Sequence, residues 1–353
     1  SPDEPFQSGP WIFRPQLQGS ISYATGLLAR SNDVESTSIA QVSPGVIVDY
    51  LPHWEFSDTP TLVYYSNKQF HNQFDNTFTV NGATEYEDWI FGFFQSFIET
   101  SQPNPQTGAQ TQEQEFLTRW SASYAYNSVV DFDMLVSEDV NIPDQYDSSR
   151  ETVWLGYLNY KMSDKTTVGI GGGPGYVSVE LGPDQIYEQL LGRIGWHPAQ
   201  KLFFTANGGF QERETIDGGV GPTFNPVFSA TLLYNMTKTT TLSAFASEEI
   251  IPSYFAGMDE DVTSLGASLS QRLFKKFFFS VSGSYNHTKF VETVSTGGAF
   301  RTDDYYILGA SLGHGFGKRG QISLNYQYSD QKSTVPGYSY KGSQIGLQLS
   351  YSY

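Results

Sequence analysis

The segment Ile345-Gly-Leu-Gln-Leu-Ser-Tyr-Ser-Tyr353 alternates strictly between apolar residues and small or polar ones. The apolar side chains are Ile345, Leu347, Leu349, Tyr351 and Tyr353. Because successive side chains of a β-strand point to opposite faces, the segment predicts a strand with one apolar and one polar face. A strand of a soluble sandwich alternates in the same way. What the pattern means therefore depends on whether it recurs along the chain.

The composition is rich in aromatic residues and poor in charge. Of the 353 residues, 16% are aromatic and only 16% are charged, against about 25% charged in an average soluble domain. Mean hydropathy is -0.35, and no apolar run approaches the ~20 residues that a membrane-spanning helix requires. A barrel with aromatic girdles outside and a polar interior is compatible with both properties. The absence of Cys excludes disulfides and thiolate metal sites.

The alternating pattern recurs about every 19 residues in segments of about 10 residues, as expected for a transmembrane β-barrel. The predicted strands are residues 16–28, 38–51, 61–70, 76–85, 89–100, 114–127, 129–140, 150–163, 166–180, 188–197, 202–214, 225–237, 239–248, 262–274, 277–287, 304–315, 321–329 and 339–353. This gives about 18 strands, an even number as in bacterial barrels. Residues 76–85 are the weakest segment, and they are retained because the alternation of long and short connections fails without them. The alternative count is 16 strands.

Short basic turns alternate with longer acidic loops between these segments. Lys165, Lys201 and Lys238 lie in short turns, whereas residues 248–260 and 292–303 form acidic loops. Such alternation predicts an all-β protein, a transmembrane antiparallel up-and-down β-barrel with both termini on the periplasmic side of a bacterial outer membrane. Residues 1–10, with three Pro, are expected to form a periplasmic arm that begins where a signal peptide was removed. Residues 11–353 are expected to form a single barrel.

Closure of the sheet satisfies the backbone in lipid, because every N–H and C=O in hydrocarbon needs a partner. The last strand is therefore expected to pair with residues 16–28. If the apolar phase faces lipid, the opposite phase lines the lumen. The pore-lining candidates on that phase are Glu115, Arg119, Asp131, Asp133, Asp139, Arg193, Arg213 and Arg272.

These charges have two interpretations: a selectivity lining in which arginines oppose carboxylates, or simple solvation of a wet interior. About 18 strands leave room for an aqueous channel. No segment is predicted to plug it, although a short loop that folds inward would narrow it.

Enzyme chemistry is not expected from this sequence. None of the five His residues has metal-site spacing, and the Gly-rich run Gly169-Ile-Gly-Gly-Gly-Pro-Gly175 lacks the Lys-Ser/Thr of a phosphate loop. In a strand, such glycines mark a bend or the close approach of another group. Asp259, Glu260 and Asp261 lack the spacing of a calcium loop and are expected to form a solvated loop rather than a metal site. No cofactor is predicted.

Two turns have similar sequences: Leu158-Asn-Tyr-Lys-Met-Ser-Asp-Lys-Thr-Thr167 and Leu233-Tyr-Asn-Met-Thr-Lys-Thr-Thr240. Together with the paired segments and the terminal aromatic, which resembles the C-terminal assembly signal of bacterial outer-membrane barrels, they resemble a family of outer-membrane β-barrel porins. Its members are often encoded near exopolysaccharide export genes. The resemblance implies an outer-membrane pore, with polysaccharide export as one role, and carries no catalytic residues.

Three functions are therefore considered: a passive pore for small hydrophilic solutes or ions, an export conduit for a secreted polysaccharide, and a structural or adhesive barrel with acidic outer loops. The expected partners are outer-membrane lipid and lipopolysaccharide, the barrel assembly machinery, and a second copy or surface-layer neighbours. The net charge of -17 argues against nucleic acid, since phosphate backbones bind basic patches.

Overall fold

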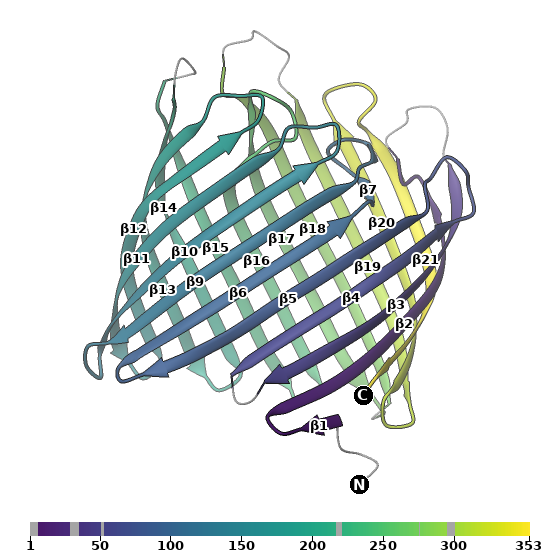
Figure 1. Ribbon diagram of the computed structural model, residues 1–353, viewed down its shortest axis with the longest axis horizontal. Helices are drawn as coiled ribbons and strands as arrows, with labels where there is room; N and C mark the ends of the chain where they lie inside the picture. Colours follow the sequence, from purple (N-terminus) through teal and green to yellow (C-terminus); the bar gives the residue numbers. More distant parts are fainter. Residues whose placement is uncertain (1–5, 29–34, 51–52, 217–220, 275, 295–300) are drawn as a thin grey trace.

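The chain forms a closed barrel of 18 long antiparallel strands, as predicted (Figure 1). The computed structural model describes residues 6–28, 35–50, 53–216, 221–274, 276–294 and 301–353. Within them, no helix has the length and apolar character to cross a membrane. The barrel strands are β2 (Trp11–Thr25), β3 (Ser36–Tyr50), β4 (Trp54–Tyr65), β5 (Gln73–Tyr86), β6 (Trp89–Thr100), β9 (Glu113–Ala125), β10 (Val130–Pro143), β11 (Ser149–Ser163), β12 (Thr166–Val179), β13 (Gln185–Ala199), β14 (Leu202–Thr215), β15 (Thr223–Thr237), β16 (Thr240–Pro252), β17 (Met258–Leu273), β18 (Phe277–Glu292), β19 (Thr302–Phe316), β20 (Gly320–Ser333) and β21 (Tyr340–Ser352).

Three short strands lie outside this cylinder of long strands. β1 (Phe6–Ser8) pairs with the beginning of β2, and β7 (Pro103–Asn104) pairs with β8 (Ala109–Gln110) as a small hairpin between β6 and β9. Phe6 also stacks on Tyr353 with the ring centroids 4.9 Å apart. Part of the expected arm is thus paired with the barrel. Residues 1–5 of that arm, and part of the predicted loop 292–303, lie outside the described residues.

The first and last long strands close the barrel. β2 pairs with β21 in a register that runs from Gln16 opposite Ser352 to Thr25 opposite Ser343. This confirms the predicted pairing of the C-terminal strand and leaves each long strand with a neighbour on both sides. The closed sheet therefore satisfies the backbone requirement that lipid imposes.

Connections of two lengths alternate around the barrel and define its two ends. Short connections such as residues 164–165 and 317–319 lie at one rim, which we call the turn end, together with β1 and the C-terminus (lower rim in Figure 1). Longer connections such as residues 101–112 lie at the opposite rim, the loop end (upper rim in Figure 1). The predicted alternation of short and long connections is confirmed.

The outer face of the barrel is an apolar surface. Residues paired directly across antiparallel strands share a face, and Ile21, Leu347 and Leu324 form one such row. Their side chains are 70%, 55% and 45% exposed. Apolar side chains with this much exposed surface are typical of a barrel in a membrane, because lipid rather than protein covers them. Ile345, Leu349 and Tyr351 lie on the same face of β21.

Most strand boundaries differ from the prediction by a few residues, and two of the differences change how a segment is interpreted. The predicted strand 61–70 runs instead from Trp54 to Tyr65, because Phe70 folds back and stacks on Tyr65 at 5.1 Å rather than extending the sheet. The predicted acidic loop 248–260 is mostly strand, since β16 continues to Pro252 and β17 begins at Met258. The connection between them is only residues 253–257.

A charge placed on the outer face of β21 tests the assignment of faces. Leu347→Arg is expected to destabilise the barrel folded in phospholipid vesicles by about 2–4 kcal/mol, because Leu347 lies mid-strand on the lipid side. The matched control is Gln348→Arg, whose side chain points to the wet interior and is expected to change stability by less than about 1 kcal/mol. Urea titration of the folded barrels measures both. Equal effects at the two positions would contradict the assignment.

Candidate functional site

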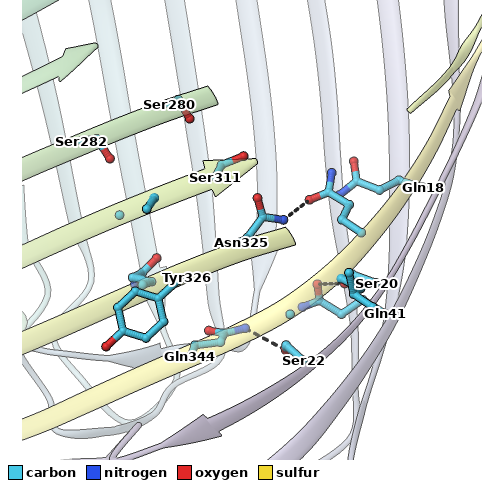
Figure 2. A pocket seen from close by; sticks show the side chains of 16 residues that line it. Gln18, Ser20, Ser22, Gln41, Ser280, Ser282, Ser311, Asn325, Tyr326 and Gln344 are labelled. Carbon is cyan, nitrogen blue, oxygen red and sulfur yellow. Dashed lines mark hydrogen bonds between the residues drawn. The ribbon is translucent and has the colours of Figure 1, made fainter. Parts of the chain in front are cut away.

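One wall of the lumen is polar and uncharged. A cavity of about 320 Å³ lies against β2, β3 and β18 to β21, and its lining contains no charged residue. Figure 2 shows serine, glutamine and asparagine side chains gathered there, with Ser20 donating to Gln41 at 3.2 Å and Gln344 donating to Ser22 at 2.9 Å. We call this surface the neutral wall. Its polar side chains are Gln18, Ser20, Ser22, Gln41, Ser280, Ser282, Ser311, Asn325, Gln327, Gln344 and Gln348.

The eight charged residues proposed from the sequence to line the pore all lie on the strand phase opposite the outer apolar rows. For example, Asp131, Asn159, Gly169 and Arg193 form one row across β10 to β13. Arg119 is exposed, whereas Arg213 is 4% exposed. Arg272 lies near the turn end, with its guanidinium carbon 5.3 Å from the centroid of the Phe278 ring. The eight residues are thus on one face but belong to separate clusters.

The first cluster joins Asp133, Asn159 and Arg193, which lie on β10, β11 and β13. We call this side of the lumen, which lies across the barrel from the neutral wall, the charged wall. Arg193 forms an ion pair with Asp133 and donates from Nε to Asn159 Oδ1 at 2.5 Å. Asn159 in turn donates to both Asp131 and Asp133 and is 1% exposed. The Arg193 guanidinium carbon lies 4.3 Å from the centroid of the Tyr157 ring. Arg193 therefore pairs with a carboxylate on its own wall.

The glycine run of β12 makes room for this cluster. A Cβ at Gly169 would lie 2.5 Å from Asn159 Oδ1, and one at Gly171 would lie 2.4 Å from Tyr157 Cδ1. Any larger residue would therefore displace the side chains that hold Arg193. This agrees with the sequence-based interpretation that the glycines mark a close approach of another group.

The β7–β8 hairpin crosses the loop end of the lumen. It starts from β6 and β9, but its tip contacts β17, β19 and β20, and β17 lies halfway round the barrel from β6. Gln106 donates to Glu260 Oε2 at 2.6 Å, Arg301 donates to the Gln106 carbonyl at 2.8 Å, and Gln331 donates to the Pro105 carbonyl at 2.9 Å. Contacts between opposite walls show that residues 101–112 span the mouth rather than standing above it.

The tip of the β16–β17 hairpin also folds inward. Pairing between β15 and β16 stops at Phe228 opposite Glu248, so the end of β16 leaves the wall. Tyr254 then reaches β9 and donates to Glu113 Oε1 at 2.7 Å, and its carbonyl accepts from the Asp147 N–H at 3.0 Å. Burial, together with the adjacent Glu113 carboxylate, raises the pKa of Tyr254 above its ordinary value, which keeps the phenol a hydrogen-bond donor.

Where the two segments meet, five charged residues are buried. We call Arg213, Asp259, Glu260, Arg301 and Asp303 the mouth cluster; their exposures lie between 0% and 7%. Buried charges persist when each is paired or hydrogen-bonded. The mouth cluster meets this condition.

Its two arginines connect the inward segments to the barrel wall. Arg213 contacts Asp259 at 3.2 Å and Glu151 at 3.5 Å, and it also donates to the Ile250 carbonyl at 3.2 Å. Arg301 forms an ion pair with Asp303, and its guanidinium carbon lies 3.7 Å from the centroid of the Tyr338 ring. The charges thus hold the two segments across the lumen.

The expectation of a solvated acidic loop is wrong for two of its three residues. Asp259 is 5% exposed and bonded to Arg213 and Gln185, and Glu260 is fully buried. Both carboxyl groups have partners from remote parts of the chain. No group of three or more metal-ligating side chains occurs in the described portion of the sequence, Asp259 to Asp261 included.

Sequence reasoning misses most of the mouth cluster. It groups Glu260 with its immediate neighbours and assigns Arg301 and Asp303 to an ordinary loop. A usable signal is present only for Arg213, which falls on the lumen phase of its strand. Glu260 and Arg301 are brought together by contacts with Gln106, which lies 154 and 195 residues away from them, respectively.

Removing the central cation should loosen the mouth. Arg213→Met is expected to cost about 3–5 kcal/mol locally, because it leaves the buried Asp259 carboxylate without its cation. Amide hydrogen exchange at residues 253–257 should accelerate accordingly. Arg119→Met, at an exposed lumen position, is the control and should change exchange there little. Unchanged exchange in Arg213→Met would show that the ion pair does not hold the tip.

Comparisons with known proteins agree with this geometry. Residues 200–353, which contain β14 to β21, match the family described as "Putative beta-barrel porin 2". No curated protein matches the sequence.

Among solved structures, OccK2 (OpdF) of Pseudomonas aeruginosa in complex with glucuronate has a TM-score of 0.50 at 10% identity, covering 96% of this chain and 98% of that one. OpdO of the same organism gives a TM-score of 0.49 at 12% identity, with 97% of each chain covered. OccAB3 of Acinetobacter baumannii gives 0.49 at 9% identity, covering 97% of this chain and 99% of that one. The family match over residues 200–353 confirms the resemblance to β-barrel porins, and the OccK2 structure has the same closed barrel fold as this chain.

Proposed function

We propose that this protein is an outer-membrane pore for small hydrophilic solutes or ions, narrowed at its loop end by residues 101–112 and the β16–β17 tip. The observation that carries the proposal is the hydrogen bonding of Gln106 and Pro105 to the opposite wall, through Glu260, Arg301 and Gln331. An 18-strand barrel is wide enough to hold water. Segments fixed across its mouth then limit which solutes enter.

The neutral and charged walls supply the rest of the channel. Hydroxyl and amide groups on the neutral wall replace water around a polar solute at little cost in hydrogen bonds (Figure 2). On the charged wall, Arg193 is paired with Asp133, which limits its net field in the lumen. Selectivity by charge is therefore expected mainly at the two mouths.

The orientation follows from the usual design of such barrels, with short turns in the periplasm and longer loops outside. Both termini would then be periplasmic, and the acidic loops would face the medium. Lipid and lipopolysaccharide would surround the exposed apolar rows that include Leu347, and divalent cations would bridge lipopolysaccharide phosphates to loop carboxylates. The assembly machinery would recognise β21, and a second copy or a surface-layer protein would be a lateral neighbour.

Conductance in planar bilayers tests the proposal. Replacing residues 101–112 by a short Gly-Ser linker is expected to raise single-channel conductance about twofold or more, because the hairpin no longer crosses the mouth. The wild-type channel should conduct at a lower level.

Replacement of residues 335–337 by Gly-Ser-Gly is the matched control. These residues lie on the same rim, and among the described residues they form no backbone hydrogen bond with the opposite wall. Their replacement should leave conductance unchanged. If neither the wild-type barrel nor the hairpin variant conducts, the pore is rejected and a structural or adhesive barrel becomes the better explanation.

A further inference from the structure

We propose that the turn end of the lumen holds a binding site for a multivalent oxyanion, that is, a solute bearing phosphate or carboxylate groups. A cavity of about 780 Å³ opens there, lined by β2 and β17 to β21 and the turns between them. We call this cavity the basic vestibule. Five cationic side chains line it: Arg14, Arg272, Lys276, Lys318 and Arg319.

The charge of this cavity is opposite to that of the chain. The sequence has 37 acidic residues against 20 Lys and Arg, yet no Asp or Glu lines the vestibule. A quarter of all basic residues are therefore gathered around one cavity. Like charges at close range repel each other, so this arrangement costs free energy unless counter-charges are supplied.

The protein itself supplies partners to several of these cations. Arg14 forms ion pairs with Asp49 at 2.6 Å and Glu55 at 2.9 Å. Arg272 contacts the Phe278 ring, and Arg319 lies with its guanidinium carbon 3.5 Å from the centroid of the Tyr353 ring. Neither Arg272 nor Lys276 forms an ion pair with a carboxylate of the described residues. A positive surplus is therefore directed into the lumen.

The register places this surplus on the transport path. Gln321, Ser350 and Gln18 form one row across β20, β21 and β2, and Gln18 also belongs to the neutral wall. Ser350 and Gln321 line the vestibule as well. The vestibule and the neutral wall are thus adjacent parts of one surface. A ligand in the vestibule would meet hydroxyl and amide groups beside the cations.

The two ends of the lumen differ in how their cations are used. In the mouth cluster, Arg213 and Arg301 are each paired with buried carboxylates. At the turn end, Arg272 and Lys276 have no carboxylate partner among the described residues and line a solvent-accessible cavity. Arginine binds phosphate and carboxylate through paired N–H donors, and a cleft lined by one sign of charge concentrates counter-ions. A multivalent oxyanion is the ligand class that this arrangement fits.

Only the role of the vestibule rests on the proposed function: in a pore, it would concentrate anions at the periplasmic mouth. Its test does not require conduction. Since the chain has no Cys, a single Ser350→Cys substitution introduces one reporter thiol in the vestibule. The folded barrel in detergent is treated with an anionic sulfonatoethyl or a cationic trimethylammonioethyl methanethiosulfonate, and each rate is divided by that of a free thiol.

The anionic reagent is expected to react about twofold faster than the cationic one with the Ser350→Cys variant, because Arg272 and Lys276 line the same cavity and their field is weakened by distance and salt screening. Arg272→Gln with Lys276→Gln in the same background should lower the ratio, since these two side chains have no carboxylate partner among the described residues. Ser282→Cys, on the neutral wall, is the matched control and should give a ratio near one throughout.

Inorganic phosphate and citrate serve as ligand probes. Either anion should slow the anionic reagent in the Ser350→Cys variant but not in the Ser282→Cys variant, and the one that protects at lower concentration identifies the preferred group. Circular dichroism and heat-dependent gel mobility show that each variant is folded. Equal reagent ratios in the two variants, or a ratio at the vestibule thiol that the double substitution leaves unchanged, would overturn the proposal even if the barrel conducts.

Discussion

The structure depends on one requirement: each backbone N–H and C=O that enters hydrocarbon must find a partner within the protein. A sheet meets it only when its first and last strands pair, as β2 and β21 do. Closure then separates two faces, one for apolar side chains in lipid and one for polar side chains in water. The buried charge clusters of this molecule arise on the inner face.

Charge inside the barrel is organised from one end to the other. Arg213 and Arg301 at the loop end connect segments of the chain and are enclosed by carboxylates and rings. Arg193 at mid-height is paired within its own wall. The cations of the turn end, Arg272 among them, border open space. The same residue type therefore connects segments of the chain in one place and lines an open cavity in another, depending on what lies within about 4 Å.

The sequence predicted the barrel well because strand alternation is a local signal. Eighteen strands, their order and the pairing of the last strand with the first all follow from side-chain periodicity and turn length. The phase of Arg213 and Asp133 follows from the same rule. The inward folding of residues 101–112 was beyond that rule, because contacts such as Gln106 with Glu260 join positions 154 residues apart. Phe70 is assigned to a strand because it is apolar, but it lies in a connection that folds back onto Tyr65.

The early separation of β16 from β15 also limits where the bilayer can lie. Above the pair Phe228 and Glu248, the edge of β15 that faces β16 has no strand partner. Its amide and carbonyl groups must be hydrated, since an open sheet edge is not stable in hydrocarbon. The acyl chains on this side of the barrel must therefore end at or below that pair, so a break in the ladder marks the water line of the membrane.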